Sequence, residues 1–291
     1  MIMKIAVIIL NYNSSEDCRK CVSFLKRQEG VELELILVDN CSPDGDKVEA
    51  LCREQNCTFI ASTENRGYNA GNNVGLRYAA ERGYKYALIA NPDMEFPQTD
   101  YVAKLVATME KDPEIVVCGS DIVEANGVHQ NPLERDGNWA TSFSWVKGIF
   151  RKKQTDSYEF IDNYKENHYC AKVSGCCLMV RMNFIQEIGF FDEYPFLYCE
   201  EPILSRQVEM TGRRMYYLAD VQAIHRHIPS TKGDPVKRFL HWKRSRLYFV
   251  NHYSGDSWIG KKVCIFSISF YVAFYKIFYY IKRFALQKEY R

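Results

Sequence analysis

Two common phosphate-binding signatures are absent from this sequence. No Gly-x-Gly-x-x-Gly pattern follows the first predicted strand, residues 5–10, and no Gly-x-x-x-x-Gly-Lys loop ending in Ser or Thr occurs in the chain. The first pattern binds the pyrophosphate of a dinucleotide, and the second binds the phosphates of a nucleoside triphosphate. Dehydrogenases and P-loop nucleotide hydrolases are therefore disfavoured as functional classes.

The chain also has little net charge and no repeated cysteine motif. Because 38 Lys and Arg stand against 36 Asp and Glu, the net charge is +2 and we expect no nucleic-acid partner. The pair Cys18-x-x-Cys21 has no matching second pair, which argues against a zinc site. Several cysteines, such as Cys118 and Cys264, sit singly in apolar segments, and no signal peptide precedes them. We therefore expect reduced thiols and a cytoplasmic protein.

Short apolar runs alternate with helical segments along the chain. This alternation predicts an α/β fold with a Rossmann-like, doubly wound, mostly parallel sheet. Ser14 and Asp17 predict a capping box at the start of the first helix. The expected strands are 5–10, 33–38, 58–61, 86–90, 115–118, 173–181 and 216–224, and the expected early helices are 14–26, 46–55, a segment ending at 83, and 101–110.

Polar residues follow three of the predicted strands. Asn11, Asp39 and Asp93 each stand at a strand's carboxyl end, which is the ligand-binding edge of an open α/β sheet. Pro92 forces the chain to turn just before Asp93, whose carboxylate suits Mg²⁺ or Mn²⁺ bound to a diphosphate. Alternatively, Asp93 is only a turn residue that caps the next helix. A Gly/Asn-rich loop at 65–73 adds amide groups suited to a nucleotide.

Two later segments carry further candidate residues. The adjacent carboxylates Glu200 and Glu201 cannot share one helix face. One can therefore point into a cleft and act as a base, while the other forms hydrogen bonds within the protein. The alternative is a helix N-terminus that favours acidic residues. His225-Arg226-His227 directly follows a predicted strand, and this position suits a metal or a diphosphate, although such histidines can also be structural.

Taken together, these motifs resemble the family 2 glycosyltransferases, in particular the rhamnosyltransferase-like branch. The resemblance implies a GT-A fold, a nucleoside-diphosphate sugar donor, a divalent metal (Mg²⁺ or Mn²⁺), and inversion at the anomeric carbon. The motifs that carry it are residues 7–13 (VIILNYN), 38–42 (VDNCS), 65–73 (NRGYNAGNN), 91–93 (NPD), 174–177 (SGCC) and 196–201 (FLYCEE).

The resemblance also assigns roles to single residues. Glu201, with Glu200 beside it, stands at the family's catalytic base, and Asp93 and His225 stand at its metal site. Asn91 replaces the first acid of the common D-x-D pattern, and Glu201 replaces an Asp. The donor-binding positions are Asn11, Asn13, Asp39, Asn40, Arg66, Asn69, Ala70, Asn72, Asn73, Asn91 and Arg226.

The end of the chain is basic and aromatic. Residues 236–246 mix cationic and aromatic side chains, and residues 263–281 form an apolar stretch with Lys276 as its one charge. This stretch nearly reaches the ~20 residues that span a bilayer. The central lysine and many tyrosines favour an in-plane membrane helix over residues 258–284, whose basic flanks would meet anionic lipid. A helix packed on protein and a true span are the alternatives.

These observations lead to one hypothesis for the whole chain. Residues 1–120 would bind the nucleotide sugar, residues 121–235 the acceptor, and residues 236–291 would form a membrane-associating helical tail. The protein would move a sugar, with rhamnose as a candidate, to a lipid-linked glycan acceptor in surface-polysaccharide synthesis at the inner face of the cell membrane. A nucleotidyltransferase would need a Gly-rich basic loop after the first strand, which is lacking.

A second alternative comes from a different class, and the oligomeric state also stays open. A catalytically weak or inactive nucleotide-sugar-binding scaffold would explain the departures at Asn91 and Glu201. A homo-oligomer is compatible with the sequence.

Overall fold

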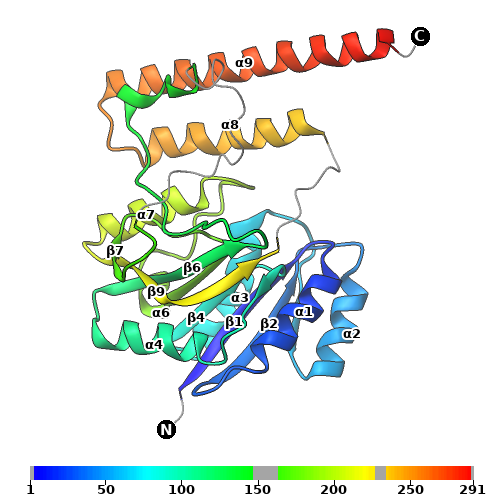
Figure 1. The fold of residues 1–291 in the computed structure, drawn as a ribbon, viewed down its shortest axis with the longest axis vertical. Coiled ribbons are helices and arrows are strands. Elements are labelled where there is room, and N and C mark those ends of the chain that lie inside the picture. Colours follow the sequence, from blue (N-terminus) through cyan, green and yellow to red (C-terminus); the bar gives the residue numbers. More distant parts are fainter. Residues whose placement is uncertain (1–2, 147–162, 227–233, 290–291) are drawn as a thin grey trace. The chain divides into compact units, whose positions relative to one another are not determined.

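The computed structural model describes residues 3–146, 163–226 and 234–289, and the chain divides into two compact units. The first unit contains all the strands found in the described residues (Figure 1). Its elements are β1 (Lys4–Asn11), α1 (Ser15–Leu25), β2 (Glu32–Asp39), α2 (Gly45–Gln55), β3 (Thr58–Ala61), α3 (Tyr68–Glu81), β4 (Tyr86–Ala90), β5 (Met94–Glu95), α4 (Tyr101–Lys111), β6 (Ile115–Glu124), β7 (His168–Cys170), β8 (Cys177–Arg181), α6 (Met182–Glu187), α7 (Glu200–Met210) and β9 (Arg214–His225).

The sheet is mixed, and most of its strands run in one direction. The strand order is β3-β2-β1-β4-β8-β6-β9-β5, with β7 also paired to β9. Strands β1 to β4 are parallel, whereas β8 runs antiparallel to both β4 and β6, and β9 is parallel to β6. This arrangement confirms the predicted α/β fold with a mostly parallel sheet.

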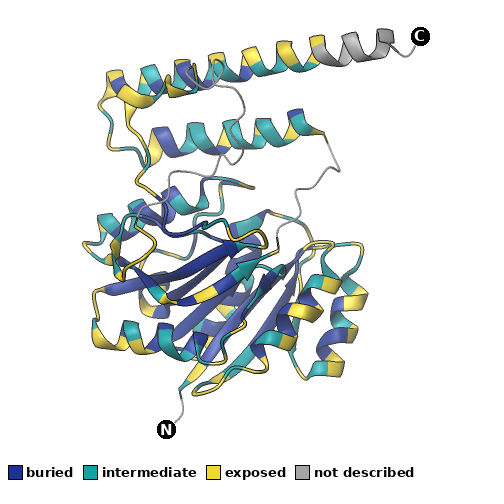
Figure 2. Ribbon diagram, viewed as in Figure 1, coloured by how far each residue is buried: buried dark blue, intermediate teal, exposed yellow. Residues whose placement is uncertain are grey.

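Side chains of β1 alternate between two hydrophobic clusters because successive residues of a strand point to opposite faces. Ile5, Val7 and Ile9 pack with α1, α2 and α4, while Ala6 and Ile8 pack with α3, α6 and α7. Both faces of the sheet are thus covered by helices, and the strands are mostly dark blue in Figure 2. Two-sided burial explains why these strands read as continuous apolar runs.

The structure corrects three local predictions. Helix α1 begins where expected, but Ser14 makes no side-chain capping bond; instead the backbone N–H of Ser15 donates to Asp44 Oδ2 at 2.9 Å. Helix α3 begins at Tyr68, so most of the predicted loop at 65–73 is helical. Strand β6 is longer than predicted and continues to Glu124, where it keeps pairing with β9.

The second unit is largely helical. It includes a 3₁₀ turn (η1, Trp139–Thr141) and two helices, α8 (Pro235–His252) and α9 (Trp258–Glu289). The Asp234 side chain caps α8 by accepting from the Val236 N–H at 2.8 Å. On α9, the Tyr275 ring lies 4.3 Å from that of Phe239, measured between centroids, and Ser267 accepts a hydrogen bond from Trp145. The predicted C-terminal helical extension is therefore present.

One half-buried carboxylate joins β2 to its neighbours in the first unit. Glu34 accepts hydrogen bonds from Tyr78 at 2.7 Å and Thr58 at 3.1 Å, and also from Tyr84, and it pairs with Lys4 at 3.2 Å. Burial alone would raise the pKa of Glu34, but these hydrogen bonds outweigh it and lower the pKa to about 2. A lowered carboxyl pKa contributes stability that is present at neutral pH and lost as the pH falls.

We predict that Glu34→Gln removes this contribution. At pH 7 the free energy of unfolding of the variant should be about 3 kcal/mol lower than that of wild type. This difference should shrink as the pH falls from about 5 to about 2, because Glu34 of wild type then becomes protonated first in the unfolded state and finally in the folded state. Urea unfolding at a series of pH values measures this. Glu32→Gln, at the exposed start of the same strand, is the control. An unchanged difference across the pH range would contradict the assignment.

Candidate active site

A polar network joins the carboxyl ends of β1 and β2. Asn11 and Asp39 lie opposite each other in the strand register, and both are buried. The Asn11 amide nitrogen lies 2.8 Å from Asp39 Oδ1, 2.8 Å from Ser42 Oγ and 3.0 Å from Asp44 Oδ1. Burial alone would raise the pKa of Asp44, but bonds from Asn11, Ser42 and Ser15 outweigh it and lower the pKa to about 2. This edge of the sheet therefore has a fixed, acidic lining.

The loops beside this network contain the next two predicted donor-binding residues. Asn13 is exposed and has a left-handed backbone, with φ of 57°. Asn40 is buried, and its side-chain amide donates to Asn65 Oδ1 at 3.1 Å and to the Gly67 carbonyl at 3.2 Å. Gly67 has φ of 99°, and a Cβ there would stand 2.3 Å from the Phe196 carbonyl oxygen. Only glycine fits this position.

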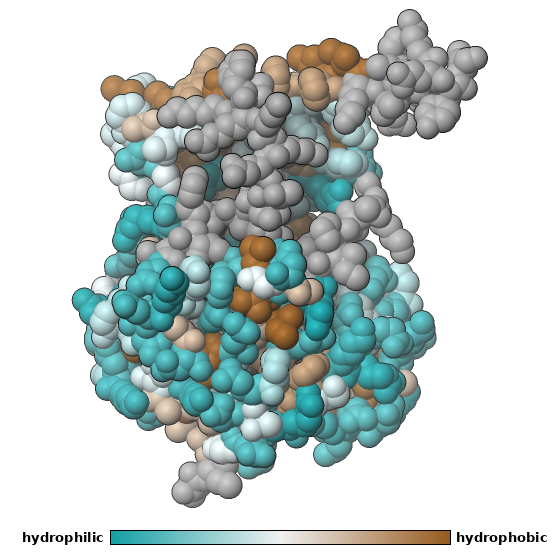
Figure 3. Space-filling view, viewed as in Figure 1, coloured by the Kyte–Doolittle hydropathy of each residue, from teal (hydrophilic) through white to brown (hydrophobic). Residues whose placement is uncertain are grey.

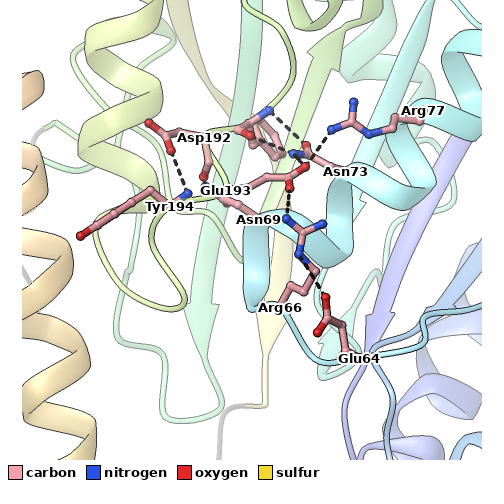
Figure 4. A network of polar contacts seen from close by, with 9 residues as sticks. Glu64, Arg66, Asn69, Asn73, Arg77, Asp192, Glu193 and Tyr194 are labelled. Atoms are coloured by element: carbon pink, nitrogen blue, oxygen red, sulfur yellow. Dashed lines mark hydrogen bonds and ion pairs between the residues drawn. The ribbon is translucent and has the colours of Figure 1, made fainter.

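Two asparagines of α3 hold the loop that follows α6, as Figure 4 shows. Asn69 donates to the Asp192 carbonyl at 2.8 Å. Asn73 donates to the Phe191 carbonyl at 2.8 Å and accepts from the Phe191 N–H at 3.0 Å. Both amides thus bind protein backbone, and their predicted contact with a donor stays a prediction.

The carboxylate of Glu193 pairs with two arginines, one just before α3 and one within it. It pairs with Arg66 at 3.0 Å and with Arg77 at 2.8 Å (Figure 4). Ala70 and Asn72 are buried in the first turns of the helix, where the Asn72 amide donates to the Tyr68 carbonyl. Arg66 and Arg77 are both exposed, and Arg66 is the one that precedes α3, in the predicted donor-binding segment.

Strand pairing brings Asp93 and His225 together, although 131 residues separate them in the chain. Strand β5 pairs antiparallel with the end of β9, so that Met94 lies opposite His225. As a result, His225 Nε2 lies 3.3 Å from Asp93 Oδ2. Arg226 extends the group, since its backbone N–H donates to the Asp93 carbonyl and its guanidinium lies 3.1 Å from Glu95. His227, the third residue of the predicted cluster, lies outside the described residues.

The proton on His225 is held by its surroundings. Burial alone would lower the pKa of His225, but hydrogen bonds with Asp93 and Cys176 outweigh it and raise the pKa to about 10. The ring is therefore an imidazolium at neutral pH when only protein surrounds it. A cation can bind Nε2 only if that proton leaves, so the affinity for metal should rise with pH.

The segment before β8 connects this pair to the predicted base. The Asn91 N–H donates to the Cys176 carbonyl at 2.8 Å, and the Gly175 N–H donates to Glu201 Oε1 at 3.1 Å. The Tyr68 hydroxyl lies 2.9 Å from Asn91 Oδ1 and 2.7 Å from the Gly175 carbonyl oxygen. Helix α7 begins at Glu200, so both acidic residues stand in its first turn. The turn that carries Asn91 and the candidate base Glu201 are thus held by one backbone segment.

The sequence as a whole identifies the family. Residues 6–189, well over half of the chain, match the pattern described as "Glycosyl transferase family 2". The chain belongs to glycosyl transferase family 2. It is 28% identical over 228 residues to the low-salt glycan biosynthesis hexosyltransferase Agl10 of Haloferax volcanii, covering 77% of this chain and 68% of that protein.

Two further comparisons support this assignment. The N-acetylglucosaminyl-diphospho-decaprenol L-rhamnosyltransferase of Mycobacterium tuberculosis is 23% identical over 261 residues, covering 86% of this chain and 85% of that one. Among solved structures, the mannosyltransferase PcManGT of Pyrobaculum calidifontis, in complex with GDP-Man and Mn²⁺, superposes with a TM-score of 0.56 at 16% identity. That alignment covers 92% of this chain and 69% of that one. The family 2 protein thus has the GT-A fold and is a glycosyltransferase.

The residues of this glycosyltransferase fit a metal that is shared with substrate. Within the described residues, no group of three or more His, Cys, Asp or Glu side chains is arranged to hold a metal ion. Asp93 Oδ2 and His225 Nε2, which lie 3.3 Å apart, offer one oxygen and one nitrogen ligand. Mg²⁺ and Mn²⁺ accept such a small protein set because phosphate oxygens and water complete their octahedral shell.

Some residues of this site gave no clear signal in the sequence. Asp44 lies in a loop that reads only as a dense turn, and Glu193 follows an ordinary turn. Gly175 was part of a recognised motif, yet its bond to Glu201 follows from the fold alone. Gln130, which contacts His225, stands between two turn signals and has no pattern of its own.

Proposed function

We propose that this glycosyltransferase is an inverting, metal-dependent enzyme that transfers a sugar from a nucleoside-diphosphate donor to a hydroxyl group of a lipid-linked glycan. The observation that supports it best is the connected set of Asp93, His225 and Glu201. The Asp93–His225 pair is linked to Glu201 through Asn91 and the Gly175–Cys176 segment. Such a connection would hold a diphosphate bound at Asp93 and His225 in a set position relative to the base.

Each residue has a separate chemical role. Asp93 and His225 would hold the divalent metal, which supplies positive charge to the leaving diphosphate. Arg226 lies beside this pair and would add to that charge. The Glu201 carboxylate would accept the proton of the acceptor hydroxyl while its oxygen bonds to the anomeric carbon and the bond from that carbon to the diphosphate oxygen breaks. Attack opposite the leaving group gives inversion.

The donor's nucleoside would lie along the ends of β1 and β2. Asp39 and the amides of Asn11, Asn13 and Asn40 line that edge, and Arg66 stands beside it. The mycobacterial relative is named for L-rhamnose transfer to a decaprenol-linked acceptor, and the Haloferax relative for glycan biosynthesis. These names support rhamnose as a candidate sugar, a lipid-linked acceptor, and a place in surface-polysaccharide synthesis.

We predict that Glu201→Gln lowers the rate of sugar transfer about 10²- to 10⁴-fold, because a positioned base contributes that much. Donor affinity should stay close to wild type, since the amide keeps the size of the carboxylate. Transfer rates and donor binding by calorimetry measure the two effects.

Glu200→Gln is the matched control, because it removes the neighbouring carboxylate of the same helix turn. Its transfer rate should fall far less. If Glu200→Gln caused the larger loss, the base assignment would be wrong. If wild type bound donor but neither transferred nor hydrolysed it, the protein would be an inactive scaffold.

We also propose that α9 associates with an anionic membrane surface. By length and composition, the part of this helix from Trp258 to Ile281 could cross a bilayer. Only 22% of its apolar 18-residue stretch is buried within the protein. Its buried positions, such as Gly260, Ser267 and Val272, fall on one side. The opposite side exposes the large apolar residues Ile259, Phe266, Phe270, Ile277 and Ile281, while Phe274 and Phe278 are exposed toward the end of the helix.

This exposed stripe has the chemistry of a bilayer interface. In Figure 3 apolar side chains gather as brown atoms along α9. The exposed Lys262 near its start supplies charge for anionic head groups. A helix that packs one side on protein and presents an apolar side to lipid can lie in the plane of the membrane.

We predict that Phe266→Ser with Phe270→Ser weakens binding to phosphatidylglycerol vesicles at least about tenfold, because two aromatic rings lose their apolar contact. Co-sedimentation of the full chain with vesicles measures this. Met210→Ser is the control, because Met210 is the exposed apolar residue at the end of α7. Equal binding by all three proteins would contradict the membrane role of this face.

A further inference from the structure

His225 is held from the side opposite Asp93 by a buried glutamine. Gln130 Oε1 lies 2.7 Å from His225 Nδ1, while His225 Nε2 faces Asp93. The other end of the same amide, Gln130 Nε2, donates to Glu124 Oε1 at 2.9 Å. Glu124 in turn lies opposite His225 in the pairing of β6 with β9. Three side chains therefore form a hydrogen-bonded chain that ends at the candidate metal site.

The direction of each hydrogen bond in this chain follows from chemistry. An ionised carboxylate can only accept, so Glu124 requires the NH₂ group of Gln130 to point toward it. The Gln130 oxygen must then point toward His225, and because that oxygen only accepts, Nδ1 must carry the hydrogen. When the ring is neutral, its lone pair is therefore on Nε2, the atom that faces Asp93. Only that tautomer can offer Nε2 to a metal.

The backbone around Gln130 keeps this chain in place. The Gln130 N–H donates to the Ile122 carbonyl at 2.7 Å. The adjacent Asn131 is buried, donates to the Ser120 carbonyl at 2.8 Å, and accepts from the Ser174 N–H at 2.8 Å. Ser174 precedes the Gly175–Cys176 segment that contacts Asn91 and Glu201. The glutamine is thus anchored, through Asn131, to the same backbone segment that donates a hydrogen bond to Glu201.

We propose that Gln130 is a positioning residue which, together with Glu124, fixes His225 in the tautomer that presents Nε2 to a divalent cation. This inference rests on the proposed metal-dependent function. Partners that donate or accept at the outer nitrogen of a ligating histidine typically change metal affinity about 10- to 100-fold. Here the partner is an amide whose orientation a carboxylate sets, so both residues are required.

The test is the Mn²⁺ affinity of the full chain, measured by electron paramagnetic resonance with saturating UDP, GDP or dTDP, whichever retains Mn²⁺ on wild type. Gln130→Met keeps the length of the side chain but removes both hydrogen bonds. We expect it to bind Mn²⁺ about 10- to 100-fold more weakly. Gln222→Met is the matched control. It also removes a glutamine-to-carboxylate hydrogen bond in the same sheet, but that bond goes to Asp121 and not to the chain that ends at His225.

A double variant separates the tautomer from simple packing. In Glu124→Gln with Gln130→Glu the relay is reversed: an amide at position 124 donates to a carboxylate at position 130, which still accepts from His225 Nδ1. We expect it to recover Mn²⁺ affinity to within a few-fold of wild type. If Gln130→Met does not fold, Glu124→Lys at high ionic strength replaces it, because a donor at 124 turns the Gln130 amide around and should lower Mn²⁺ affinity at least about tenfold.

The outcomes distinguish this inference from the proposed function. If wild type retains Mn²⁺ and Gln130→Met matches Gln222→Met, the positioning role is wrong while the metal-dependent function stands. A double variant no better than Gln130→Met would also overturn it, because a side chain that only fills space would not respond to hydrogen-bond direction. If wild type retains Mn²⁺ with none of the nucleotides, the proposed metal dependence fails, and the inference fails with it.

Discussion

The two-residue pairing of β5 with the end of β9 is the constraint on which the candidate site depends. Strand β4 ends at Ala90, Asn91-Pro92 turns the chain, and β5 then continues antiparallel to β9. That pairing sets Met94 opposite His225 and so brings the imidazole to Asp93. Because Pro92 lacks an N–H, the ladder of β4 cannot continue through it, and the chain turns to place Asp93 before β5.

Buried polar groups at this edge of the sheet are consistently arranged as connected networks. Asn11 contacts three acceptors at the end of β2 and in the loop after it, and Gly175 donates to Glu201 beside the segment that contacts Asn91. A buried polar atom costs free energy unless it is hydrogen-bonded. The networks therefore serve the fold and the site at once, since they make burial tolerable and leave each functional side chain in one orientation.

The sequence was most informative where a local pattern determines the structure. The strand 58–61 was predicted with its observed bounds, because a short apolar run between turn signals has few other solutions. The α/β fold and the meeting of Asp93 with His225 also followed from strand ends and from the family resemblance. The start of α3 was missed because Gly67 precedes it with no side-chain cap, so the segment resembles a loop.

Contacts between segments that are distant in the chain could not be predicted from the sequence. Asp44, rather than Ser14, binds the first turn of α1 from a separate loop. Gln130 reaches His225 across 94 intervening residues, and no local spacing announces that contact. The roles of single donor-binding residues likewise stay predictions, since Asn69 and Asn73 bind backbone in the structure.

The most direct test of the account is thermal unfolding of the full chain with nucleoside-diphosphate sugars, each with and without Mn²⁺. The account predicts that at least one donor raises the melting temperature by about 2 °C or more only when Mn²⁺ is present, because a bound ligand stabilises the folded state. The rise should disappear in Asp93→Ala and persist in Asp46→Ala, an exposed carboxylate of α2. An equal rise without metal, or in Asp93→Ala, would contradict the central claim that Asp93 holds the donor through a divalent cation.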